Sequence, residues 1–327
     1  MGLKLDNMRE RLVLRAMDAL TRLLDGPRGG GAYLLRGRME PPWAVRMRDR
    51  APAGLVVVLA GGAWIGDDSG EAVALGPGDV AVLRGPDEFT VADSPSTEPQ
   101  VILHPGLRCT DPDGEDITGS LSLGPRLWGN SLSGSTSLLL GCHQLRGEVS
   151  KRLLTALPTM LMVPAAELDP PLIPLLAAEL DKDGPGQDAV LDRLFDLVFA
   201  AVLRAWFSRD VAQRPAWYRA YGDPIVANAL RLLHEQPAHP WTVASLAGHC
   251  GISRAALAKR FTDTVGEAPM SYLTGWRLAL AADRILDPNT TLESVAREVG
   301  YGSGFALSTA FKREHGLSPR EHRARTS

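Results

Sequence analysis

The last hundred residues of this 327-residue chain contain one sequence pattern twice. The first half of the pattern recurs at an offset of 49 positions, first as Val243, Leu246, Ala247 and Cys250 and then as Leu292, Val295, Ala296 and Val299. The second half recurs at an offset of 50, first as Leu257, Phe261, Gly266 and Pro269 and then as Leu307, Phe311, Gly316 and Pro319. Apolar residues at i, i+3, i+4 and i+7 are typical of one helical face. Each repeat is therefore expected to fold as a short helix, a turn and a second helix.

Turn and cap residues support this reading in both repeats. Gly251 and Gly300 stand in the two turns, where glycine permits a left-handed backbone. The residues predicted to cap the four helices are Thr242, Ser253, Thr290 and Ser303, with Glu293 completing a capping box after Thr290. A helix, a glycine turn and a second crossing helix form a helix-turn-helix unit. Two units joined by a helix suit successive turns of one DNA groove, roughly 34 Å apart.

The region also resembles the DNA-binding domain of the AraC/XylS regulators. The runs that carry the resemblance are Trp241–Ala247, Ser253–Phe261, Gly266–Arg277, Val299–Tyr301 and Phe311–Arg313. The resemblance implies a DNA-binding domain over residues 223–325, preceded by a linker at 211–222. It implies double-stranded promoter or operator DNA as the partner, and RNA polymerase if the protein is an activator.

Helix-turn-helix geometry predicts which residues contact DNA, because the second helix of each unit enters the major groove. With Leu257, Phe261, Leu307 and Phe311 pointing inward, the predicted contact residues are Arg254, Ala255, Ala258, Lys259, Arg260, Gly304, Phe305, Ser308, Thr309, Lys312 and Arg313. Lys259 is the candidate for guanine contact, and Arg254 and Arg260 for phosphate. Thr309 occupies a place that the family usually fills with arginine, so the second unit is expected to be less base-specific. A rotated helix would instead bury Phe305.

Charge distribution agrees with a DNA reader joined to a different domain. From Pro215 to Ser327 the chain has 13 Lys and Arg against 10 Asp and Glu, whereas the rest carries a net charge of −6. Three cysteines are too few for a disulfide framework. There is neither a signal-peptide pattern nor an apolar run of about 20 residues, so a cytoplasmic protein without a membrane span is expected.

Residues from Ala32 to about Val163 change to short apolar runs separated by Gly, Pro and Asp, which predicts an antiparallel barrel or a jelly roll. The run Leu75–Pro86 resembles the turn and strand of cupins, and Met39–Trp43, His104–Cys109 and Gly147–Pro158 resemble the effector domain of one branch of AraC regulators. The expected fold class is therefore α+β: a cupin-like sensor at residues 1–165, with a first helix at Asn7–Leu24, and an all-α tandem helix-turn-helix domain.

Two helices are predicted between these domains, at Asp169–Leu180 and Gln187–Phe207. The second is apolar on more than one side, since Leu197, Phe199 and Leu203 lie off its main stripe, and such a helix must be covered twice. Residues 166–210 are therefore expected to form a dimerisation segment in a homodimer, with burial inside one chain as the alternative.

Several residues of the barrel could bind a ligand. Trp43, Trp64, Arg84 and Trp128 are candidates for an unidentified small-molecule effector, on apolar and cationic character. Cys109 and Cys142 could form a thiol switch, or bind metal with His104 and His143. However, neighbouring Cys142 and His143 would point to opposite faces of a strand, so all four cannot converge.

A cupin enzyme is the rival function. The chain has no His-x-His motif for a cupin metal site and no nucleophile elbow or phosphate loop. No catalytic residue, cofactor or metal is therefore expected, and the sequence favours a regulator.

Overall fold

The computed structural model describes residues 33–68, 70–143, 147–155, 157–168, 172–209 and 222–326. They form two compact units. One, here called the barrel unit, contains residues 28–145 and 157–209; the other, here called the helical unit, contains residues 146–156 and the chain from 210 onward. The predicted helix at Asn7–Leu24 and the linker at 211–222, apart from Gly222, lie outside the described residues.

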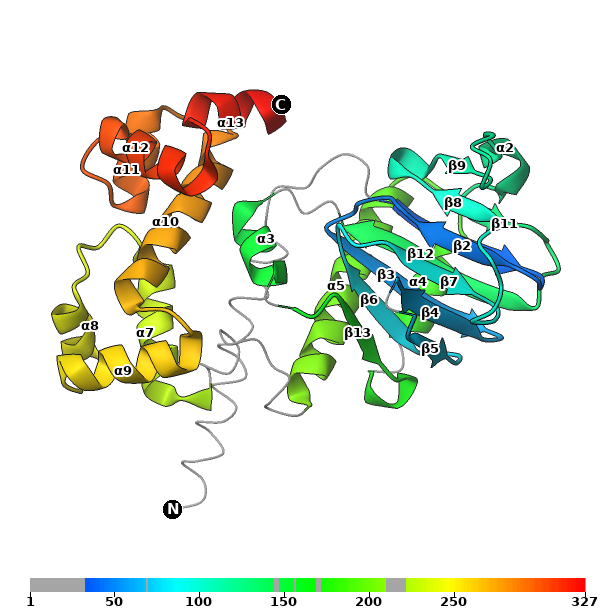
Figure 1. Ribbon diagram of the computed structural model, residues 1–327, viewed down its shortest axis with the longest axis horizontal. Helices are drawn as coiled ribbons and strands as arrows, with labels where there is room; N and C mark the ends of the chain where they lie inside the picture. The colour runs from blue at the N-terminus through cyan, green and yellow to red at the C-terminus, as the bar shows by residue number, and fades with distance from the viewer. Residues whose placement is uncertain are drawn as a thin grey trace, which may run out of the picture. The chain divides into compact units, whose positions relative to one another are not determined.

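Two sheets form the barrel unit (Figure 1). In spatial order, the seven-stranded sheet contains β10 (Ser122–Gly124), β11 (Leu127–Gly129), β1 (Tyr33–Met39), β12 (Thr136–His143), β3 (Ala53–Ala60), β6 (Val80–Arg84) and β13 (Met160–Val163). The six-stranded sheet contains β5 (Ala72–Leu75), β4 (Ala63–Asp67), β7 (Phe89–Ala92), β2 (Ala44–Met47), β8 (Val101–Leu103) and β9 (Cys109–Thr110). Short helical turns lie at η1 (Pro105–Leu107), α2 (Thr118–Leu121) and η2 (Ala165–Glu167).

The barrel core lies between the sheets, since strands of both contribute to one buried cluster. Side chains alternate along a strand, so Val56 and Val58 of β3 point into this core while Leu55 and Val57 point outward. The predicted cupin-like barrel is thus confirmed, and every second residue of its large sheet faces away from the interior.

Two helices cover the outer face of the large sheet: α4 (Leu172–Leu180) and α5 (Gln187–Ser208). The α5 helix lies so close to β12 that a Cβ added to Gly141 would be 2.7 Å from the ring of Phe195. Phe199 and Leu203, which seemed at the sequence level to need a second cover, are fully buried within the chain. Leu197 alone of the three off-stripe residues is exposed, at 48%, so these helices do not by themselves require a partner.

The helical unit contains eight described helices: α3 (Glu148–Thr155), α7 (Pro224–Glu235), α8 (Val243–His249), α9 (Arg254–Val265), α10 (Pro269–Ile285), α11 (Leu292–Val299), α12 (Gly304–His315) and α13 (Pro319–Thr326). The expected caps are present at Thr242, Ser253 and Ser303. The fourth prediction was wrong by one residue: Thr291, whose hydroxyl accepts from the Ser294 N–H, opens α11, whereas the Thr290 hydroxyl donates to carbonyls of the preceding turn. Within the described ranges, no helix has the length and apolar character needed to span a membrane.

Candidate nucleic-acid interface

Both helix-turn-helix units have the geometry that the repeated pattern predicts. Leu257 and Phe261 of α9 and Leu307 and Phe311 of α12 are all fully buried. Gly251 and Gly300, in the two turns, have φ angles of 71° and 88°, a left-handed conformation that disfavours other residues. The inward apolar positions therefore fix which face of α9 and of α12 remains available to a ligand.

The α10 helix belongs to both units (Figure 1). It has 17 residues, which corresponds to a length of about 25 Å. Leu278, Ala281, Ala282 and Ile285 of α10 pack in the core of the second unit with Val295 and Phe311 among others. Trp276, two residues before Leu278 on the same helix, is fully buried and stacks on His234 of α7, with ring centroids 4.0 Å apart. One rigid helix thus anchors both units and fixes their spacing.

Two arginines with matching roles were missed by the sequence reasoning. Arg277 of α10 donates to the carbonyls of Pro237 and His239, in the loop before the first unit. Arg323 of α13 donates to the carbonyls of Ile285, Asp287 and Thr290, before the second. The two arginines are 46 residues apart, whereas the repeats are offset by 49 or 50, so extending the repeat alignment does not pair them.

The predicted contact residues of α9 lie on its solvent-facing side, except that Ala258 is half-buried. The Lys259 side chain is 79% exposed and makes an ion pair of 2.6 Å with Asp263, one turn later on the same helix. That pair raises the pKa of Lys259, so the lysine is charged at neutral pH. Arg260 pairs with Asp223, which caps α7. Part of its guanidinium therefore holds two helices of the protein together.

On α12, Phe305 is 84% exposed, which contradicts the rotated-helix alternative. Lys312, Arg313 and Thr309 are exposed, and Ser308 is half-buried. The outward placement predicted for Gly304 was wrong. Gly304 is buried, and its N–H donates to Glu293 Oε2 at 2.7 Å. A Cβ at Gly304 would lie 2.9 Å from that oxygen, so glycine here allows α12 to approach α11 closely.

The four effector candidates do not come together. Trp43 is fully buried in the barrel core. Trp64 and Arg84 alternate with the core residues Ile65 and Leu83, so they face away from the interior. Only Trp128 among them lines the cavity of about 190 Å³ that lies against the barrel core.

The cysteine candidates are buried. Cys109 and Cys142 are 1% and 0% exposed, and burial raises the pKa of the Cys109 thiol. A thiol with a raised pKa has little nucleophilic thiolate at neutral pH. His104 contacts the hydroxyl of Thr110 at 3.0 Å, and among the described residues no three His, Cys, Asp or Glu side chains group to hold a metal. The side chain of His143 lies outside those residues.

Comparisons with known proteins agree with both units. Residues 18–208 match a cupin family model, and residues 246–325 match a helix-turn-helix domain model. An AraC-like transcription regulator of Streptomyces lividans is 34% identical over 261 residues, which are 79% of this chain and 81% of that protein. The chain belongs to the AraC-like transcription regulators.

Two further relatives extend the comparison. The transcriptional activator RclR of Escherichia coli, named as RCS-specific, is 31% identical over 65% of this chain and 79% of its own length. A solved structure of the AdpA DNA-binding domain with a target DNA is 32% identical, covers 32% of this chain and 92% of its own, and has a TM-score of 0.29. On the two family models and the regulator relatives, this AraC-like chain is a DNA-binding transcriptional regulator with a cupin-like N-terminal domain.

The regulator has one helix in its helical unit that the sequence reasoning did not foresee. The α3 helix lies in the chain between the barrel strands β12 and β13 but packs on α10. Arg152 pairs with Glu267 at 2.6 Å and lies 5.1 Å from the ring centre of Tyr272. Asp283 accepts from the N–H of Glu148 at 2.6 Å and of Val149 at 3.4 Å, at the start of α3. The contacts of α3 thus lie near both ends of α10: Glu267 and Tyr272 near its start, and Asp283 in its last turn.

Asp283 should make the stability of this contact depend on pH. Burial raises its pKa from 3.8 to about 6, against the two N–H donors and Lys151, while Glu148 adds to the rise. The folded state then binds more protons than the unfolded state between these values, so this residue's contribution is most favourable below about pH 4 and declines as the pH rises through 6. Over this pH range, the contribution of Asp283 to the free energy of unfolding falls by at most about 3 kcal/mol.

Denaturant unfolding from pH 4 to 7 measures this effect. Asp283→Asn should flatten the decline relative to the unmodified chain, since asparagine does not titrate and its oxygen still accepts a hydrogen bond. A parallel pair of curves would show that Asp283 does not titrate in this range.

Proposed function

We propose that this regulator binds a specific site in double-stranded promoter or operator DNA with α9 and α12 in successive major grooves. One observation carries the proposal: each unit buries its Leu and Phe pair and leaves the opposite side of the same helix open to solvent. On that side the Lys259 side chain is 79% exposed and Phe305 is 84% exposed. Lys259 would contact guanine. Ala255, Ala258, Ser308 and Thr309 would face other base edges, and Arg254, Arg260, Lys312 and Arg313 the phosphates. Gly304 has no direct role in this proposal.

The barrel unit serves as the sensor in this proposal. A small-molecule effector would enter the cavity beside Trp128, whose lining is mainly apolar: Leu35, Leu103, Leu107, Leu127 and Leu140. An effector that prefers one arrangement of the regulator shifts its population on DNA. The absence of the His-x-His motif supports a sensor that is not an enzyme.

A homodimer in the cytoplasm is also proposed. Leu175 of α4 and Val190 and Leu197 of α5 are between 45% and 49% exposed, and apolar side chains of this size favour burial against a partner. The name of RclR as an activator supports RNA polymerase as a partner.

Selection of duplexes from a random library with the purified full chain tests DNA recognition. We expect a recovered site of two short elements about 10 base pairs apart, bound with strong salt dependence. Recovery of unrelated duplexes with equal affinity would contradict sequence-specific recognition.

A further inference from the structure

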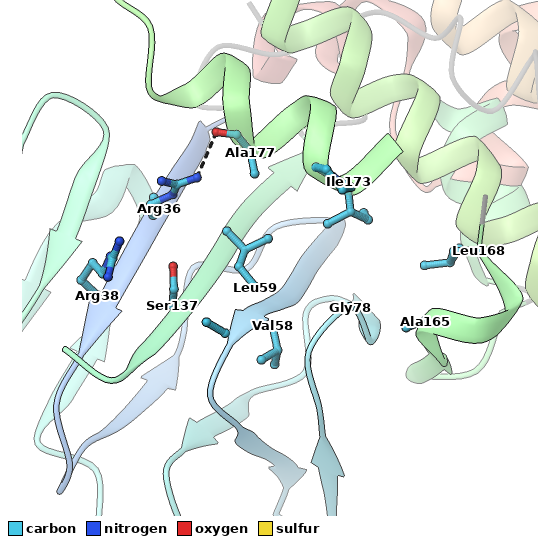
Figure 2. A pocket seen from close by; sticks show the side chains of 12 residues that line it. Arg36, Arg38, Val58, Leu59, Gly78, Ser137, Ala165, Leu168, Ile173 and Ala177 are labelled. Carbon is cyan, nitrogen blue, oxygen red and sulfur yellow. Dashed lines mark hydrogen bonds between the residues drawn. The ribbon is translucent and has the colours of Figure 1, made fainter. Parts of the chain in front are cut away.

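A second pocket of the barrel unit lies on the outer face of the large sheet, beneath α4 (Figure 2). Its volume is about 540 Å³, which is within the usual range of roughly 300–1,000 Å³ for small-molecule sites. Strands β1, β3 and β12 form one side, and η2 and α4 form the other. The pocket and the cavity beside Trp128 have no described lining residue in common.

The lining combines apolar side chains with two guanidinium groups. Leu59, Ala165, Leu168, Ile173 and Pro174 are apolar residues of the lining. Arg36 and Arg38 point outward because they alternate on β1 with Leu35 and Met39, which pack in the core. The described residues of the lining include no carboxylate, and the two guanidinium groups give this part of the lining a positive charge.

The two arginines have different surroundings. Arg36 is bound to α4: it donates to Asp181 at 2.6 and 2.8 Å and to the carbonyl of Ala177 at 3.0 Å. Its Nε atom is buried and has no hydrogen-bond partner. Arg38 is half-buried, and its side chain makes no hydrogen bond or ion pair with the described part of the chain. Arg38 thus retains its whole guanidinium for a ligand.

Ser137 supplies a second polar group at the same place. It is the direct cross-strand partner of Arg38, and such partners lie on the same face with Cβ atoms about 5 Å apart. Ser137 is 6% exposed and its hydroxyl makes no hydrogen bond within the described residues. Figure 2 shows this hydroxyl beside Arg38 and on the pocket side of β12. A hydroxyl on the pocket wall that makes no bond within the protein can donate a hydrogen bond to a ligand.

We propose that this pocket binds a small organic monoanion with a carboxylate head and an apolar body. The carboxylate accepts two hydrogen bonds from Arg38 and one from the hydroxyl of Ser137, because a guanidinium matches the geometry of a carboxylate. The apolar body lies between Leu59 of β3 and Ile173 of α4. The bound ligand contacts both the sheet and the helix that covers it, and so stabilises their packing.

Calorimetric titration of the DNA-free full chain tests this site, with 2-naphthoate as the probe. The neutral 2-naphthalenemethanol and the cationic 2-naphthylmethylamine have the same apolar body and serve as matched ligands. We expect naphthoate to bind, to raise the melting temperature as its concentration rises, and to bind at least about tenfold more tightly than either matched ligand.

Variants of the protein test whether the ligand binds in this pocket. Arg38→Gln should weaken naphthoate binding by about tenfold or more, since a charged hydrogen-bond pair is lost. Ala177→Leu should weaken it by filling the pocket from α4. Arg204→Gln, an exposed arginine of α5 that does not line the pocket, should have no effect. Two independent variants keep the test valid if one of them fails to fold.

Three results would overturn the proposal: no naphthoate binding at millimolar concentration, equal binding of the neutral alcohol, or unchanged affinity in Arg38→Gln. Loss of affinity in Arg126→Gln alone would place the anion in the cavity beside Trp128, which Arg126 also lines, and would overturn it as well. None of these outcomes depends on DNA, so failure here leaves the proposed DNA recognition untouched.

Discussion

Replacing Arg254 and Lys259 together by alanine is expected to reduce affinity for the selected duplex by about 100-fold or more near physiological salt. Each is an exposed cation on the open face of α9, and one such contact is typically worth about tenfold or more. The slope of log affinity against log salt concentration should also fall by about two. Fluorescence anisotropy with the labelled duplex at several salt concentrations measures both quantities.

The matched control removes the same charge from the barrel unit. Lys182→Ala with Arg204→Ala replaces two exposed cations on residues outside the helix-turn-helix units. This control should bind DNA with nearly the affinity of the unmodified chain. An equal loss of affinity in both double variants would indicate a general charge effect, and no loss in the α9 variant would remove α9 from the interface.

Phe311→Ala is expected to destabilise the helical unit by about 3–5 kcal/mol, because truncating a fully buried phenylalanine leaves a cavity in the core of the second unit. Phe305→Ala supplies an unusually close control, since Phe305 lies on the same helix but is 84% exposed. It should leave stability nearly unchanged and weaken DNA binding through loss of an apolar contact with bases. Denaturant unfolding and anisotropy on both variants separate the two effects.

An equal loss of stability in the two variants would contradict the exposed position of Phe305. If Phe305→Ala destabilised the protein as much as Phe311→Ala, Phe305 would be covered in solution, and α12 could not present that side chain to DNA.

The repeat made the C-terminal half predictable. Its apolar spacing fixed the buried faces of α9 and α12, because the Leu and Phe of each helix are four residues apart and lie on one side of it. The barrel strands followed from short apolar runs: the runs Leu55–Ala60, Val80–Leu83 and Ser137–Gly141 lie within β3, β6 and β12. Sequence patterns succeed here because the apolar positions within a single helix or strand determine which of its faces is buried.

Contacts between segments far apart in the sequence could not be predicted in this way. Gly304 was placed outward by helical periodicity, but the close approach of α11, with Glu293 bound to its N–H, buries it. The docking of α3 on α10 joins Glu148 to Asp283, 135 residues apart. Neither contact has a local sequence pattern, so neither could be derived without the fold.

The ligand pockets show the same limit. The effector candidates were chosen by residue type, and three of the four do not line the cavity beside the barrel core. Arg38 and Ser137 are far apart in the sequence, and only the pairing of β1 with β12 brings them together. Strand register, rather than composition, brings a cation and a hydroxyl to one pocket.

Hydroxyl-radical footprinting of the full chain on the selected duplex tests the central claim most directly. Two recognition faces joined by α10 predict two protected segments on one side of the duplex, centred about one helical turn apart. Phe305→Ala should weaken protection in one segment and Lys259→Ala in the other. A single protected segment, or two segments that weaken together in each variant, would contradict the claim that α9 and α12 contact separate grooves of one duplex.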